Sequence, residues 1–272
     1  MSPAAGASGP QWHGDPALAR TIERELVPRL LLAHRVGPFP PFGDAYLAPA
    51  IALVSGDDLQ RFLAEVLAED DDAVARFVGQ IVARGVTLEA VCLDLLAPTA
   101  RHLGELWETD QRDFFEVTVA LGRVHRAMRE AIQRAAAPTV EPESAGQALI
   151  SSLPGEQHTL GLAMVAEFFS RDGWSVQLGA PGTEEELSSL VRTGWLDVVG
   201  FSVTSEDRLL TLRRGIATAR RLSQNPNLII IVGGRVFTEH PELVTRVGAD
   251  GHAITAVGAP ACARDLLGRS PR

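Results

Sequence analysis

The sequence lacks most of the features that would mark a membrane, secreted or nucleic-acid-binding protein. Its 272 residues include only two cysteines, Cys92 and Cys262, without CxxC spacing, so neither a disulfide nor a cysteine-based metal site is expected. No apolar run approaches the roughly 18 residues of a membrane span. The net charge is −9 and the chain has no run of Lys and Arg. This argues against direct binding to nucleic acid or to anionic lipid.

The first fifteen residues, MSPAAGASGPQWHGD, also lack the basic segment and the apolar stretch of a secretory signal. We therefore expect a cytoplasmic protein. The composition, 46% hydrophobic and 22% charged, is that of a folded globular chain. At about 100–200 residues per domain, the length allows two hydrophobic cores.

Changes in composition and periodicity divide the chain into four segments. Residues 1–16 are rich in Pro, Gly, Ala and Ser, which predicts a flexible tail. Residues 17–136 have the apolar spacing of helices, and residues 137–146 (APTVEPESAG) have no periodicity and are typical of a linker. In residues 147–272 short apolar runs alternate with amphipathic ones, which predicts a second domain.

The first of these domains is predicted to be a helical bundle, because apolar residues recur every three or four positions. Asp57 and Asp58 mark the start of one helix, Gly85 stops the next, and Thr87 can cap the one after that. The segment GPFPPFGDAYLAP at 37–49 is typical of a loop. The residues expected on inward faces are Leu18, Ile22, Leu26, Leu30, Leu59, Phe62, Leu63, Val66, Leu67, Val74, Phe77, Val78, Ile81, Val82, Leu88, Val91, Leu95, Leu96, Val117, Leu121, Val124, Met128 and Ile132.

The second domain is predicted to be a parallel sheet covered by helices on both faces. The candidate strands are ALISSL, SVQL, DVVGFSV and LIIIV, and the candidate helices lie near 158–171, 184–193, 206–222 and 240–247. A weaker fifth unit spans 250–268. Apolar strands joined by helices indicate a doubly wound, flavodoxin-like (Rossmann-like) domain. The fold class expected for the whole chain is therefore a helical bundle followed by this α/β domain.

Polar residues and glycines gather where three of the strands end. PGEQHTLG follows the first strand, FSVTSE ends the third, and VGGRV ends the fourth. In a doubly wound sheet ligands bind at the carboxyl ends of the strands. We therefore expect a His, a Ser/Thr pair and a Gly-Gly pair at one edge of the sheet.

These three elements resemble the cobalamin-binding module of methionine synthase, corrinoid proteins and cobalamin-dependent mutases. Glu156-Gln157-His158-Thr159-Leu160-Gly161 is similar to the D-x-H-x-x-G motif of that module. Ser202-Val203-Thr204 follows after 40 residues and Gly233-Gly234 after 28 more, which matches the family's spacing. Gly251 and Ala253, in the fifth unit, complete the candidate cofactor-binding residues.

The resemblance implies a role for each motif. His158 would be the lower cobalt ligand in place of the cofactor's own dimethylbenzimidazole, since imidazole nitrogen suits such a metal. Ser202 and Thr204 would offer hydroxyls to the displaced nucleotide tail, and the glycines would let the tail approach the backbone. The chain departs from the family at Glu156, where Asp is usual, so axial ligation is less firmly implied than binding of the tail.

A further resemblance concerns the helical half, which in light-sensing cobalamin-dependent transcription factors and in methionine synthase covers the upper face of the corrin. Leu103-Gly104-Glu105-Leu106-Trp107 is similar to their L-G-x-x-W motif, so Trp107 is the candidate capping residue. The light-sensing regulators then have Glu-His where this chain has Val117-Thr118, so their upper axial contacts do not transfer. Other residues placed to reach the upper face are His102, Phe114, Phe115, Glu116 and His125, although a lone His on a bundle helix usually has no ligand role.

Taken together, the motifs are most similar to those of the AerR/PpaA group of regulators. This resemblance implies a non-enzymatic, cobalamin-dependent antirepressor, with adenosyl- or hydroxocobalamin as cofactor. Its partner would be a DNA-binding repressor of the CrtJ/PpsR type that controls photosystem genes, with light acting at the upper ligand.

Several alternatives stay open at this point. One is a corrinoid component that carries methyl groups between methyltransferase subunits, because its architecture would be similar. Another is a haem sensor on the same fold, although haem has no nucleotide tail to fill a Gly-Gly slot. A hydrolase using Ser202 and His158 would lack a G-x-S-x-G elbow. A phosphoacceptor receiver would lack its acidic cluster after the first strand.

Overall fold

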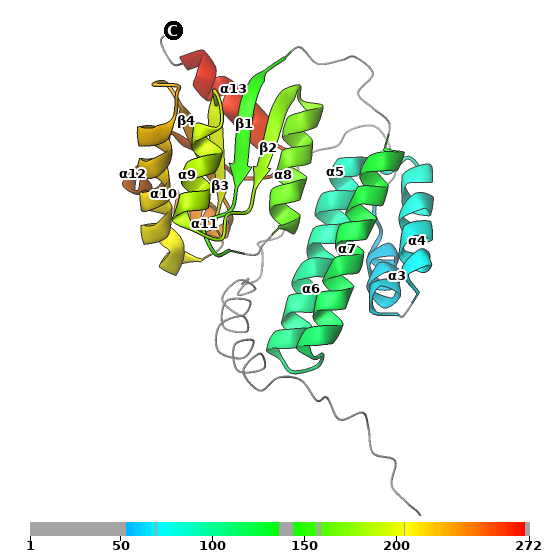
Figure 1. Ribbon diagram of the computed structural model, residues 1–272. Helices are drawn as coiled ribbons and strands as arrows, with labels where there is room; N and C mark the ends of the chain where they lie inside the picture. Colours follow the sequence, from blue (N-terminus) through cyan, green and yellow to red (C-terminus); the bar gives the residue numbers. More distant parts are fainter. Residues whose placement is uncertain (1–52, 69, 136–143, 157–158, 204, 270–272) are drawn as a thin grey trace, which may run out of the picture.

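The structure is a computed structural model that describes residues 53–68, 70–135, 144–156, 159–203 and 205–269. The tail at 1–16, the stripe from Leu18 to Leu30 and the loop at 37–49 lie outside these residues, as does most of the predicted linker. Figure 1 shows a helical layer beside a sheet that carries helices on both faces. No helix in the described ranges combines the length and the apolar composition needed to cross a bilayer.

The helical layer consists of α3 (Gly56–Leu67), α4 (Asp71–Ala83), α5 (Leu88–Ala90), the π-helical segment η2 (Val91–Leu96), α6 (Ala97–Glu108) and α7 (Phe114–Arg134). The predicted stripes from Leu59 to Ile132 point into its core. The predicted boundaries at Gly85 and Thr87 are confirmed, because Gly85 has φ +85° and the Thr87 side chain accepts a hydrogen bond from Ala90 N–H at 3.2 Å.

Cys92 and Cys262 are both free thiols, and burial raises the pKa of Cys92 to about 12.

The π-helical segment ends two residues before Pro98, which stands within the long helix that runs from α5 to α6. A proline inside a helix donates no N–H and its ring clashes with the carbonyl four residues earlier. The widened turn accommodates this, since the N–H of Ala97 bonds to the carbonyl of Cys92, five residues back. The sequence pattern alone predicted one regular helix here.

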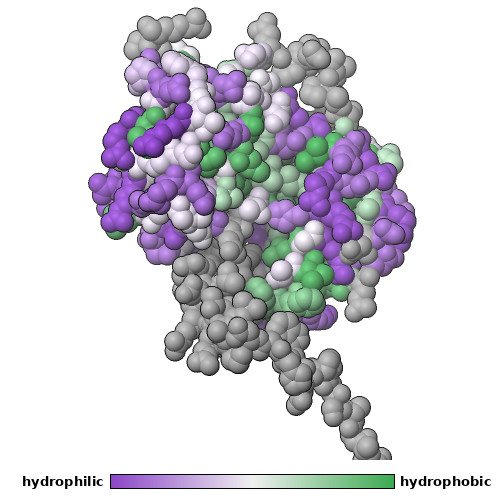
Figure 2. All heavy atoms as spheres, viewed as in Figure 1, coloured by the Kyte–Doolittle hydropathy of each residue, from purple (hydrophilic) through white to green (hydrophobic). Residues whose placement is uncertain are grey.

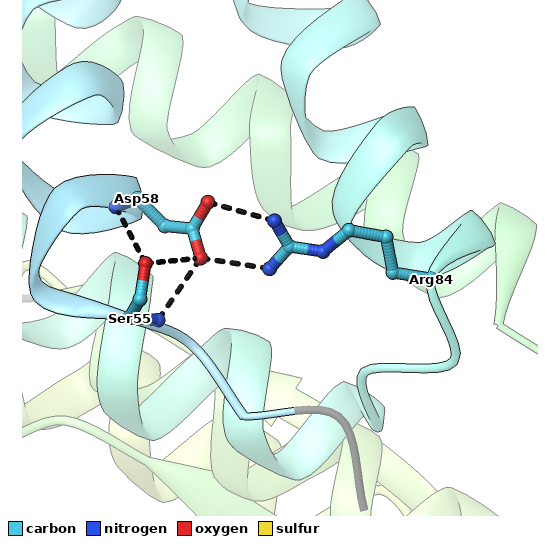
Figure 3. A network of polar contacts seen from close by, with 3 residues as sticks. All are labelled: Ser55, Asp58 and Arg84. Atoms are coloured by element: carbon cyan, nitrogen blue, oxygen red, sulfur yellow. Dashed lines mark hydrogen bonds and ion pairs between the residues drawn. The ribbon is translucent and has the colours of Figure 1, made fainter.

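A buried carboxylate joins the start of α3 to the end of α4 (Figure 3). Ser55 and Asp58 form a capping box, in which Asp58 N–H donates to Ser55 Oγ at 3.1 Å and Ser55 N–H donates to Asp58 Oδ2 at 2.9 Å. Arg84 donates two hydrogen bonds to Asp58, at 2.9 and 2.7 Å. These bonds, with Arg84 contributing most, hold the pKa of Asp58 well below its usual range. Asp58 is 4% exposed, whereas the side chain of Arg84 is 46% exposed, so the carboxylate is buried and its ion pair meets water on the arginine side.

We predict that Asp58→Asn destabilises the protein by about 1–3 kcal/mol at pH 7, because it removes the charge from a buried set of hydrogen bonds. The pKa of the folded state lies below that of the unfolded state, so the carboxylate stabilises the fold above the unfolded value, near pH 4. The difference between wild type and variant should therefore shrink as the pH falls through about 4 toward 2. Urea unfolding at several pH values measures it.

Asp57→Asn is the matched control, because Asp57 is the exposed neighbour in the same helical turn. Its effect should stay within about 0.5 kcal/mol at every pH. An Asp58→Asn effect that does not depend on pH would contradict the assigned role of the carboxylate.

The second domain contains five strands: β1 (Gly146–Ser151), β2 (Trp174–Gly179), β3 (Val198–Ser202), β4 (Ile229–Gly233) and β5 (Gly251–Ala253). All pairings are parallel, in the order β2-β1-β3-β4-β5. This is the flavodoxin-like order, so the predicted fold class is confirmed. Gly146, which the sequence pattern placed at the end of the linker, is the first residue of β1.

Helices cover both faces of this sheet. One face packs against α9 (Glu184–Arg192), α10 (Leu209–Leu222), α11 (Arg235–Glu239) and α12 (Leu243–Val247), and a short turn of helix, η3 (Glu206–Arg208), precedes α10. The other face packs against α8 (Leu160–Arg171) and α13 (Ala259–Arg269). The fifth predicted unit is thus a short strand followed by a full helix.

Helix α8 also packs against the helical layer. Leu162 and Phe169 lie in the core beneath the sheet, whereas Met164 and Phe168 are buried in the core of the bundle. Figure 1 shows α8 standing between the strands and the bundle. The two domains are therefore joined by apolar contacts along one helix.

Candidate functional site

Three of the predicted site residues are neighbours across the carboxyl edge of the sheet. In the parallel register Ser202 of β3 pairs with Gly233 of β4, and Gly233 pairs with Ala253 of β5. Each ends its strand, so the three residues form one row. The sequence predicted this convergence from the strand ends, and the structure confirms it for these residues.

A cavity of about 220 Å³ opens beside this row, between the sheet and helices α8 and α13. Gly161, Ser202, Gly233, Gly234 and Ala253, all predicted from sequence, line it. The remaining lining residues are Ile150, Leu162, Val165, Phe169, Gly200, Phe201, Ile231, Val232, Arg235, Thr238, Ile254, Thr255, Ala256 and Ala259. The wall is therefore mainly apolar, with three hydroxyls and one guanidinium.

The sheet side of the cavity is lined by small residues that share one face of the sheet. Side chains alternate along a strand, so Gly200 and Ser202 of β3 face the same side as Ile150 of β1. A Cβ at Gly200 would stand 3.0 Å from Cδ1 of Ile150, and a Cβ at Gly233 would meet only the carbonyl oxygen of Ala253, at 3.6 Å. Gly233 therefore leaves open space beside the cavity, whereas the space at Gly200 is taken up by Ile150.

Gly200 was missed from the sequence. The available signal was a glycine in the middle of the apolar run VVGFS, because a glycine inside a strand often marks the close approach of a ligand.

The two glycines at the end of β4 have different surroundings, although both line the cavity. Gly234 has φ +109°, and a Cβ there would lie 2.0 Å from the carbonyl oxygen of Val203. The chain's own backbone therefore requires Gly234. Gly233 has no such constraint, and it is the glycine whose missing side chain widens the cavity.

Two other predicted residues serve the core rather than the cavity. Val203 is fully buried on the opposite face of the sheet, and its N–H donates to the carbonyl of Gly233 at 2.9 Å. A Cβ at Gly251 would stand 2.9 Å from Cδ1 of Leu266, so Gly251 allows α13 to pack closely on β5. Neither residue lines the cavity, so their predicted contacts with a cofactor stay predictions.

The loop after β1 is described only in part. Gln157 and His158, and also Thr204 after β3, lie outside the described residues, so their predicted roles stay predictions. Glu156 precedes them, and its Oε2 atom is buried. Leu160 starts α8 and packs against the bundle core.

Thr159 and His125 connect this loop to the bundle. Thr159 Oγ1 lies 3.3 Å from Nε2 of His125, which is on α7. Burial, with a smaller effect of Arg129, lowers the pKa of His125, so its imidazole is neutral at pH 7. His125 was a candidate for the upper face of a corrin, which stays a prediction, and in the structure it contacts Thr159, the residue before α8.

Trp107 lies in the last turn of α6, packs partly against the bundle core, and meets Phe114 of α7 edge to face, with ring centroids 6.3 Å apart. It does not line the cavity. In Figure 1 the connection between α6 and α7 lies toward the same end of the molecule as the carboxyl ends of the strands. Figure 2 shows hydrophobic residues near this end of the two helices, where Phe115 is 74% exposed.

Comparison with known proteins shows to which family a chain with this arrangement belongs. Two families, both described as a B12 binding domain, match residues 146–261 and residues 58–135. A Rhodobacter capsulatus protein, described as the uncharacterized 20.5 kDa protein in the bchF-crtJ intergenic region, is 30% identical over 166 residues, which are 61% of this chain and 85% of that protein. The chain belongs to the AerR/PpaA-like family of cobalamin-binding proteins.

A solved structure has the same fold as this AerR/PpaA-like protein. The monomethylamine corrinoid protein of Methanosarcina barkeri superposes with a TM-score of 0.62 at 14% identity, covering 77% of this chain and 98% of that chain. The helical layer followed by a parallel sheet is thus a known arrangement.

The residues of this AerR/PpaA-like protein fit the nucleotide tail of a cobalamin. The tail is an elongated group with an aromatic base, a ribose and a phosphodiester. The cavity offers an apolar wall, the open space at Gly161 and Gly233, and hydroxyls on Ser202, Thr238 and Thr255. Arg235 is the one charged residue in the described wall, and it also pairs with Glu239 at 3.4 Å.

We predict that the adjacent glycines respond differently to substitution. Gly234→Ala should destabilise the protein by more than about 2 kcal/mol, because a Cβ would collide with backbone at a positive φ. Gly233→Val should leave the melting temperature within a few degrees but weaken cobalamin binding at least about tenfold, because its side chain would enter the cavity. Thermal unfolding of the cofactor-free protein and titration with hydroxocobalamin measure the two effects.

Gly233→Ala, whose Cβ has room at 3.6 Å from its nearest neighbour, is the control for the loss of the glycine itself. Strong binding by Gly233→Val would mean that the cavity is not the place of the tail.

Proposed function

We propose that this protein is a cobalamin-dependent sensor, rather than an enzyme, that acts as an antirepressor. Its cobalamin would lie at the carboxyl edge of the sheet, with the nucleotide tail in the cavity between the sheet and helices α8 and α13. A change at the upper face of the cofactor would alter how the protein binds a DNA-binding repressor of the CrtJ/PpsR type that controls photosystem genes.

The single observation that carries the cofactor part of this proposal is the cavity. It opens at the row formed by Ser202, Gly233 and Ala253, and it penetrates between the sheet and two helices. A haem lacks a nucleotide tail and would leave this space unfilled, so the cavity favours cobalamin over the haem alternative. Arg235 would face the phosphodiester of the tail, where its charge is complementary.

The lower cobalt ligand in this proposal is His158. In the sequence it lies in the loop between β1 and α8, directly before Thr159, the residue that precedes α8. Glu156 would accept a hydrogen bond from the second imidazole nitrogen and so fix the tautomer. When bound, the cofactor supplies a cobalt whose upper ligand can be exchanged.

The upper face in this proposal is covered by the bundle. Trp107 is held by Phe114 at the end of α6 that lies toward the carboxyl edge. A large aromatic ring can cover a corrin by apolar contact without binding the metal.

Two observations support the regulatory part. The similar Rhodobacter capsulatus protein is described by its place between bchF and crtJ. The net charge of −9 disfavours direct binding to DNA, and it is compatible with binding to a basic, DNA-binding partner. A corrinoid methyl carrier is the second candidate, because a corrinoid protein shares the fold.

For the cofactor, we predict that His158→Ala weakens binding of hydroxocobalamin by about 10- to 100-fold and removes the spectral signature of a histidine-bound cobalt. Absorption spectra during titration, before and after illumination of the adenosylcobalamin form, provide the measurement. Cobinamide, a corrinoid without the nucleotide tail, is the matched ligand control and should bind weakly to both proteins. An unchanged spectrum in His158→Ala would contradict the ligation.

For the function, we predict that loading with cobalamin changes the affinity for a CrtJ/PpsR-type repressor at least about fivefold and reduces that repressor's occupancy of its operator. Titration of the purified proteins, by fluorescence anisotropy on operator DNA, gives both values. In parallel, the reduced protein is offered a methylated amine together with a corrinoid methyltransferase. Formation of methylcobalamin with turnover, and no effect on the repressor, would favour the methyl carrier.

A further inference from the structure

The residue before α8 uses its side chain in an unusual way. Thr159 occupies the cap position, but its hydroxyl does not accept a hydrogen bond from the first turn of the helix. Capping by Ser, Thr or Asp is what these residues ordinarily do at such a position. Among the helices that the structure describes, five others are capped in that way, by Ser55, Asp70, Thr87, Asp113 and Thr183.

The hydroxyl of Thr159 contacts the other domain instead. It lies 3.3 Å from Nε2 of His125 on α7, in a partly buried position. Because burial keeps this imidazole neutral, one ring nitrogen donates and the other accepts, so either partner can supply the proton. The backbone of Thr159 still serves α8, since its carbonyl accepts from Ala163 N–H at 2.9 Å.

This contact lies at one end of a longer interface. Met164 and Phe168 of α8 are buried in the bundle core, and Leu160 and Ala163 pack against it. The apolar contacts fix α8 against the bundle but allow some sliding, because they have little directionality. A hydrogen bond at the first residue fixes the position of the helix start.

We propose that His125 is a positioning residue for the cobalt ligand, acting through Thr159. Thr159 is joined by one peptide bond to residue 158, so the hydrogen bond restrains the backbone that carries the His158 side chain. The inference rests on the proposed function, because it needs His158 to bind cobalt. A displacement of the bundle at the upper face would then loosen the lower ligand as well.

The test is Thr159→Val, which keeps the shape of the side chain and removes the hydroxyl, with Thr159→Ser as the variant that restores it. Each protein is loaded with cobalamin, reduced to the Co(II) form and examined by electron paramagnetic resonance, with ¹⁵N-labelled histidine to identify the axial nitrogen. We expect Thr159→Val to lower the histidine-bound fraction to less than half and to weaken hydroxocobalamin binding about fivefold. Thr159→Ser should return both values to those of the wild type.

His125 is tested in the same way with His125→Phe and His125→Gln. The Gln amide can replace the hydrogen bond and should restore most of the ligation, whereas Phe should behave like Thr159→Val. The double variant Thr159→Val/His125→Phe should be no worse than either single variant, because both remove one interaction.

Thr193→Val is the matched control, because Thr193 lies at the end of α9 on the opposite side of the sheet and donates to the carbonyl of Ser189. It should leave ligation and affinity unchanged. Circular dichroism and thermal unfolding of the cofactor-free proteins separate a local effect from a loss of folding.

Full histidine ligation in both Thr159→Val and His125→Phe, with a normal wild type, would overturn the positioning role and leave the proposed function intact. A wild type that binds cobalamin without an axial histidine nitrogen, or does not bind it, would overturn the proposed ligation together with this inference. Loss of ligation in Thr159→Val that Thr159→Ser does not restore would also overturn the role of the hydroxyl.

Discussion

The burial of α8 on two sides is the constraint on which the rest of the structure depends. Leu162 and Phe169 belong to the core beneath the sheet, and Met164 and Phe168 belong to the core of the bundle. A helix with two apolar faces cannot be exposed on either without a large loss of hydrophobic stabilisation. The start of α8 therefore packs against both domains, next to the carboxyl edge of the sheet.

The cavity is a second consequence of the packing of helices on the sheet. Two helices, α8 and α13, cover one face of the sheet, and the strands beneath them carry glycine at positions 200 and 233. Close packing would normally fill such a space with side chains. Here Gly233 keeps space open and Gly200 makes room for Ile150, while Gly234 fixes the turn beside the cavity. One part of the cavity is thus set by the backbone, and the side chains of its wall set the rest.

Much of this could be predicted from the sequence because it depends on local signals. The strand order class, the stop at Gly85 and the cap at Thr87 follow from periodicity and from residues with strong conformational preferences. The meeting of Ser202, Gly233 and Ala253 follows from the rule that parallel strands end at one edge. What could not be predicted depends on long-range geometry. The difference between Gly233 and Gly234 is set by the carbonyl of Val203, 31 residues away from Gly234. The hydrogen-bond partner of Thr159 is set by how α7 packs beside α8, which no sequence spacing reveals.

The widened turn before Pro98 has an effect on the far end of its helix. Each residue of a regular α-helix advances about 100° around the axis, and a single π-helical turn adds one residue to the count without adding a turn. The faces of α6 are therefore rotated by about that angle relative to a helix that continued regularly from Leu88. Leu103 is buried and Trp107 packs beside Phe114 in the helix as it continues after this turn. The widened turn thus contributes to the direction of the indole ring, which stands nine residues after Pro98 in the chain.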